Sequence, residues 1–105
     1  MNNPMKEIIT EIDDRTVESS LGWRVEIVSI NALRYQEKDQ TITFEIEDYP
    51  DFAGEPEWTI YIPPKCKWQG QSHDEATIDQ EKLDEITDRI NTAFWKLDMK
   101  IKEIA

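Results

Sequence analysis

Two side chains in this sequence could act together as a nucleophile and a base, because the chain has one cysteine and one histidine. Cys66 lies between two lysines, whose charge could lower the pKa of its thiol, and His73 precedes Asp74, which could orient the imidazole ring. A lone histidine in a polar connection is more often solvated, and a cysteine just after a strand is more often packed. The Cys66–His73 pair is therefore the weaker interpretation, and we predict that the protein is not an enzyme.

Other catalytic and ligand-binding patterns are missing from the sequence. The 23 acidic residues form many carboxylate pairs, but their spacing singles out none as an acid/base pair. One cysteine and one histidine cannot supply a zinc set, and no segment has the Asp and Gly spacing of a calcium loop. The three glycines, Gly22, Gly54 and Gly70, are too far apart for a phosphate-binding loop. We predict no catalytic residue, no metal site and no cofactor.

The most distinctive spacing belongs to the segment EIEDYPDFAGEPEW, residues 45–58, which has six carboxylates, three aromatic rings and no lysine or arginine. Concentrated charge speeds association with an oppositely charged partner by roughly 10 to 1,000-fold, and exposed aromatic rings often anchor interfaces. In the alternative interpretation, Phe52 and Trp58 pack on a sheet and the carboxylates are only solvated. We predict a surface that binds a basic protein, made of Glu47, Asp48, Tyr49, Asp51, Phe52, Glu55 and Glu57.

Length and charge limit the remaining choices. A chain of 105 residues predicts a single domain spanning 1–105, and the net charge of −11 argues against direct binding of nucleic acids or anionic membranes. No apolar run reaches the ~18 residues that a membrane span needs, and the start MNNPMKEIITEIDD is not a secretory signal. One cysteine fits a reducing compartment. We therefore predict a cytoplasmic protein, although solubility alone could account for the acidic charge.

The elements that position these residues begin with a predicted short N-terminal helix. Asn3 would cap it and Pro4 would be its first residue. Helical spacing of i, i+3, i+4 and i+7 relates its apolar residues, Met5, Ile8, Ile9 and Ile12. A strand stays open as an alternative, because isoleucine is only a moderate helix former.

Alternation of apolar and polar residues predicts strands over 23–30, 33–36, 41–47 and 58–62. The polar connection 37–40 predicts a hairpin with a longer turn, since it lacks Asn-Gly and Asp-Gly. The acidic segment 45–58 then becomes a loop between two strands, and Pro63-Pro64 ends the second of them. Residues 70–77 read as a polar linker.

The C-terminal helix, predicted over 79–97, has the clearest pattern in the chain. Its apolar stripe consists of Leu83, Ile86, Ile90, Ala93, Phe94 and Leu97. Its start has two candidate caps, a Thr77–Gln80 capping box or Asp79 with a hydrophobic staple. Leu97, Met99 and Ile101 alternate with polar residues and indicate a short final strand. We predict an α+β fold, an antiparallel sheet of about four strands with this helix on one face and a short N-terminal helix.

The order LRYQEKDQTITFEIE, WTIYIP, a tryptophan turn and the closing helix EITDRINTAFWKL resembles small bacterial immunity proteins of contact-dependent growth inhibition systems. The resemblance covers 23–97 and rests on the pattern Leu33-x-Tyr35-x-Glu37, a strand, and then Ile86-Thr87-x-Arg89-Ile90. It implies a cytoplasmic, monomeric inhibitor without catalytic residues. Its partner would be the C-terminal domain of a cognate toxin, often a basic nuclease, whose active site the inhibitor covers.

Charge and resemblance point to the same function. A nuclease needs a positive cleft to hold phosphates, and an acidic, aromatic surface can occupy that cleft. We therefore expect an immunity protein that neutralises a nuclease acting on RNA, tRNA in particular. The alternative is an acidic adaptor or nucleic-acid mimic that sequesters a cellular nucleic-acid-binding protein.

Overall fold

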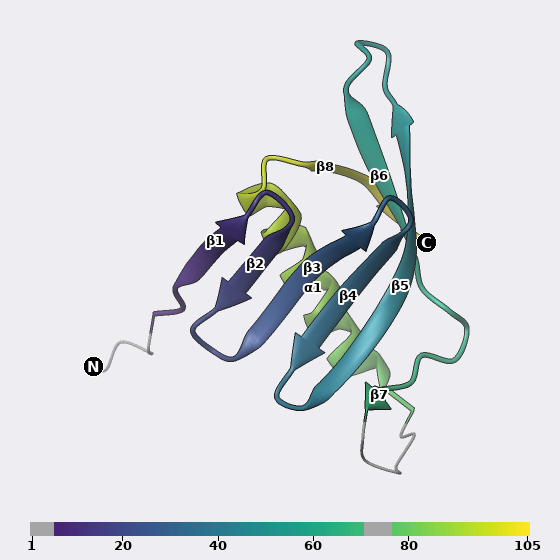
Figure 1. Cartoon of the computed structure of the whole chain (residues 1–105). Coiled ribbons are helices and arrows are strands. Elements are labelled where there is room, and N and C mark those ends of the chain that lie inside the picture. The colour runs from purple at the N-terminus through teal and green to yellow at the C-terminus, as the bar shows by residue number, and fades with distance from the viewer. Residues whose placement is uncertain (1–5, 71–76) are drawn as a thin grey trace.

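A computed structural model describes residues 6–70 and 77–105, which form a sheet and one long helix, α1 (Figure 1). The helix runs from Gln80 to Lys96. The strands are β1 (Ile9–Asp13), β2 (Thr16–Ser19), β3 (Trp23–Ser29), β4 (Ala32–Glu37), β5 (Gln40–Pro50), β6 (Pro56–Tyr61), β7 (Gln69–Gly70) and β8 (Lys100–Ile104).

The sheet has the order β1-β2-β3-β4-β5-β6-β8, and the short β7 pairs with the start of β5. Neighbouring strands are antiparallel as far as β6, whereas β6 and β8 are parallel. Helix α1 contacts β2 and β3 near one edge and β8 at the other edge. The sheet therefore curls around the helix as a half-barrel (Figure 1).

The predicted fold class is wrong in two respects. The sheet is mixed and has seven strands along its path in place of about four antiparallel ones. The predicted N-terminal helix is also wrong, because Ile9–Asp13 forms β1 and pairs with β2; Asn3, Pro4 and Met5 lie outside the described residues. A β-branched residue suits a strand, and here only Ile9 packs on the core while Ile8 and Ile12 stay exposed.

Alternating apolar residues build the core, as the sequence predicted for the central strands. On β3, Trp23, Val25 and Ile27 are buried, and each faces a residue of β4 on the same side of the sheet. Leu83 and Leu97 of the predicted apolar stripe are only partly buried, and so is Ile62 at the end of the predicted strand 58–62. Ala93 and Phe94 of the predicted apolar stripe and Cys66 are buried as expected, whereas Val17 and Ile78 are buried outside the predicted strands and helix.

The predicted C-terminal helix is confirmed, with bounds one residue shorter at each end. Asp79 is the N-cap, and its carboxylate accepts the backbone N–H of Lys82 at 2.8 Å. After the helix, Asp98 adopts a positive φ of 59° and the N–H of Met99 donates to the carbonyl of Phe94 at 2.8 Å. This turn sends the chain back along the helix into β8, which makes the parallel pair with β6.

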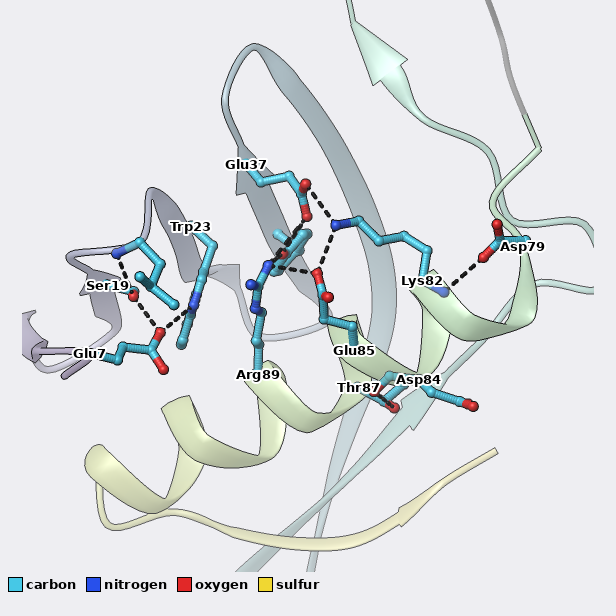
Figure 2. A network of polar contacts seen from close by, with 12 residues as sticks. Glu7, Ser19, Trp23, Glu37, Asp79, Lys82, Asp84, Glu85, Thr87 and Arg89 are labelled. Carbon is cyan, nitrogen blue, oxygen red and sulfur yellow. Dashed lines mark hydrogen bonds and ion pairs between the residues drawn. The ribbon is translucent and has the colours of Figure 1, made fainter. Parts of the chain in front are cut away.

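A polar network connects α1 to the end of β4 (Figure 2). The Glu37 carboxylate accepts hydrogen bonds from the Tyr35 hydroxyl at 2.7 Å and from Lys82 Nζ at 2.9 Å, and Arg89 Nη1 lies 3.4 Å from it. The Arg89 guanidinium also lies 5.6 Å from the centre of the Trp23 ring. These contacts fix the rotation of the helix against the sheet, because they join side chains from three separate elements.

The Glu37 network predicts a pH-dependent stability. Burial opposes ionisation of Glu37, but hydrogen bonds from Lys82 and Tyr35 and the positive charges outweigh it, so its pKa lies below the usual 4.5. A lowered pKa stabilises the fold above pH 4.5 and loses that contribution as pH falls through the folded-state value. We expect Glu37→Gln to lower the free energy of unfolding by about 1–3 kcal/mol at pH 7.

The loss should shrink between pH 7 and pH 3, which urea unfolding at both pH values would measure. Glu45→Gln is a matched control, since it removes the same charge from an exposed position on β5. It corrects for the general relief of repulsion in a chain of net charge −11. An equal loss at both pH values would contradict the proposed ionic role of Glu37.

Candidate functional site

The acidic segment predicted to be a loop is a β-hairpin. Strands β5 and β6 stay paired from Glu45 with Tyr61 as far as Pro50 with Pro56, and only 51–55 form the turn. The hairpin projects beyond the ends of the neighbouring strands (Figure 1). The loop prediction failed because acidic residues are poor strand formers on their own, whereas here each residue from Glu45 to Pro50 is paired with a residue of β6. Paired strands hold their side chains in fixed positions, whereas an unpaired loop does not.

Asp51 builds the turn at the tip. One carboxylate oxygen accepts the backbone N–H groups of Ala53 at 2.8 Å and Glu55 at 2.9 Å, and Gly54 takes a positive φ of 83° that suits glycine. The pKa of Asp51 is lowered, and the hydrogen bond from the backbone N–H of Glu55 is the largest cause. Asp51 therefore holds the turn in shape, and its role in partner binding stays a prediction.

The two faces of the hairpin divide the predicted residues. Glu47, Tyr49 and Glu57 share one face, where the Tyr49 hydroxyl donates to the Glu47 carboxylate and this bond raises the pKa of Tyr49. Asp48 and Trp58 are opposite each other on the second face, which continues from the buried Ile46. Successive side chains of a strand point to opposite sides. The predicted residues thus do not form one continuous patch.

Lys100 of β8 brings a positive charge to the hairpin. Its Nζ lies 3.3 Å from the Glu57 carboxylate and 3.7 Å from that of Asp51, because β8 pairs with β6 in a register that places Lys100 beside Glu57. The sequence segment around the acids has no basic residue, so this contact could not be read from it. The alternation of Met99, Lys100 and Ile101 was the one available signal that a strand carries this lysine.

The aromatic residues also separate into two groups. Trp58 is partly buried and packs edge-on against Phe94 of α1, with 6.2 Å between the ring centres. Phe52 at the tip is fully exposed, and Tyr49 is about half exposed at 50%. The packing alternative is therefore right for Trp58 and wrong for Phe52. A fixed turn that presents an exposed phenyl ring, with exposed Glu55 beside it, is the candidate binding site.

The described residues give no support to the Cys66–His73 pair. Cys66 is buried, and burial raises the pKa of its thiol, opposite to the lowering expected from the flanking lysines. His73 lies outside the described residues. Across 6–70 and 77–105, no three His, Cys, Asp or Glu side chains gather closely enough to hold a metal ion.

No family model, curated protein or solved structure matches this chain. The described part contains no helix of the length and apolar character that crossing a membrane requires. Its function is therefore inferred from the geometry and charge of the hairpin.

Proposed function

We propose that this protein binds a basic protein partner through the β5–β6 hairpin and neutralises it, as an immunity protein neutralises a nuclease toxin. The observation that carries the proposal is the fully exposed Phe52 at the tip of a projecting hairpin. Exposed apolar rings on rigid supports are typical interface anchors, because little entropy is lost when they bind. The bonds of Asp51 to Ala53 and Glu55 provide that rigidity.

The charge of the hairpin favours a partner with a positive cleft. Six acids lie within 45–58, and Lys100 is paired with two of them, so the segment stays strongly negative. The chain as a whole carries −11, which disfavours association with a second copy or with nucleic acid. A nuclease acting on RNA, tRNA in particular, has the required positive cleft. An inhibitor of such an enzyme would work as a monomer in the cytoplasm.

Co-expression with the protein encoded by the neighbouring gene tests the proposal. Production of that protein alone should stop growth and degrade RNA, and co-production of this chain should restore growth through a stable complex. The same rescue with Phe52→Ala should be weaker. A neighbour that is harmless alone, or a complex with a cellular nucleic-acid-binding protein in its place, would contradict the toxin proposal and favour the sequestering alternative.

Glu55 provides a test of electrostatic attraction. Its side chain is exposed next to Phe52 and, in the described part of the chain, forms no ion pair. We expect Glu55→Gln to slow association with the partner about two- to fivefold at low salt, with little effect at high salt or on thermal stability. Asp88→Asn on the exposed face of α1 is the matched control. If both changes slowed association equally, the net charge of the protein and not the charge of the hairpin would attract the partner.

A further inference from the structure

A hollow of about 350 Å³ lies beside the base of the hairpin. Its lining comes from the β1–β2 turn, the end of β3, the two hairpin strands and the turn after α1. The side chains that matter to its chemistry are Arg15, Ile27, Ile30, Asp48, Trp58 and Met99. Strand pairing joins Asp48 to Trp58, and a backbone hydrogen bond joins Arg15 to Ile27. The curl of the sheet brings these two groups together, because β4 lies between β3 and β5.

The walls of the hollow are mostly apolar, with one carboxylate and one guanidinium among the lining residues. Ile27 is buried, Trp58 and Met99 are partly buried, and Ile30 is 73% exposed at the entrance. In the described part of the chain, no ion pair or side-chain hydrogen bond occupies Asp48. An apolar recess beside an available carboxylate fits a ligand that has both an apolar stem and a positive end.

We infer that this hollow receives an arginine side chain of the basic partner, paired with Asp48. The inference rests on the proposed function, because it takes the partner to be basic. The methylene groups would contact Ile30 and Met99, and the planar guanidinium would lie against the Trp58 ring while it donates to the Asp48 carboxylate. A purely apolar occupant would leave the exposed Asp48 carboxylate without a partner.

Arg15 distinguishes this occupant from an acidic one. An acidic group would pair with Arg15 and be repelled by Asp48 and by the net charge of −11, whereas an arginine pairs with Asp48 and is repelled only by Arg15. Asp13 and Asp14, next to Arg15 in the chain, reduce that repulsion. The charge balance therefore favours a cation, and removal of Arg15 should improve its binding.

The hollow and the hairpin tip are close enough for one partner to contact both. Asp48 and Phe52 are four residues apart, so at most about 13 Å of extended backbone separates them. Asp48 is on the hairpin face that leads into the hollow, opposite to the face of Tyr49. A partner that covers Phe52 can thus place an arginine at the hollow.

Titration of the full chain with N-acetyl-arginine N-methylamide, followed by NMR, tests the inference without the partner. We expect shifts of the Asp48, Ile30 and Trp58 signals and a dissociation constant on the order of millimolar, as for a ligand of this size. Asp48→Asn should weaken binding about two- to fivefold, because Asp48 is exposed and water screens its ion pair with the ligand, and Arg15→Gln should strengthen binding by a similar factor. Asp88→Asn should change nothing. Melting curves identical to wild type would show that the variants remain folded.

The corresponding norleucine and glutamate amides serve as comparison ligands. Equal binding of the norleucine amide would overturn the pairing with Asp48. If the glutamate amide binds and Arg15→Gln abolishes this binding, the hollow receives an acidic group. If the arginine amide does not bind, the inference is wrong. With the partner itself, loss of affinity in Phe52→Ala but not in Asp48→Asn would refute this inference alone. No loss in either variant would refute the proposed function as well.

Discussion

Replacement of Ile90 with alanine is expected to lower the free energy of unfolding by about 2–5 kcal/mol, because it removes a fully buried branched side chain and leaves a cavity. Ile90 is 0% exposed and belongs to the face of α1 that the sheet surrounds. A loss of this size is a large part of the 5–15 kcal/mol typical of a small domain. Urea unfolding at pH 7 would measure it.

Ile30→Ala is the matched control for Ile90→Ala, since it deletes the same atoms from a side chain that is 73% exposed. It should change the free energy of unfolding by less than about 0.5 kcal/mol. A similarly small change for Ile90→Ala would show that this face of the helix is not packed in the core. The comparison thus tests the burial of the helix separately from the residue type.

Replacement of Phe52 with alanine is expected to weaken partner binding by at least about 2 kcal/mol, or roughly 30-fold, through faster dissociation. The phenyl ring is fully exposed in the free protein, so its loss should leave thermal stability unchanged. Surface plasmon resonance with the neighbouring gene product would give the two rate constants, and thermal melting would report stability.

Leu21→Ala is a matched control for Phe52→Ala, because Leu21 is also an exposed apolar residue but lies in the β2–β3 turn. That turn is at the end of the sheet away from the projecting hairpin (Figure 1). The Leu21→Ala variant should therefore bind the partner as the wild type does. If Phe52→Ala binds normally while a helix variant such as Asp84→Asn loses affinity, the binding surface lies on α1 and the hairpin proposal is wrong.

The sequence by itself determined the elements whose signals are local. The apolar stripe of α1 and the alternation in β3, β4 and β5 are set by residues within a few positions of each other. For the same reason the sequence identified the acidic and aromatic composition of 45–58. Those signals located the segment but did not show that it is a hairpin. The sequence left two candidate caps for the helix, of which the structure has Asp79.

The tertiary structure decided everything that depends on contacts between distant segments. Ile9–Asp13 becomes a strand because β2 pairs with it, and Lys100 reaches Asp51 and Glu57 because the turn at Asp98 brings β8 alongside β6. Strand register divides the predicted site residues between the two faces of the hairpin. The curl of the sheet forms the hollow that both Arg15 and Asp48 line. Local patterns cannot encode these features, since pairing partners far apart in the chain are selected by the burial and hydrogen bonding of the whole fold.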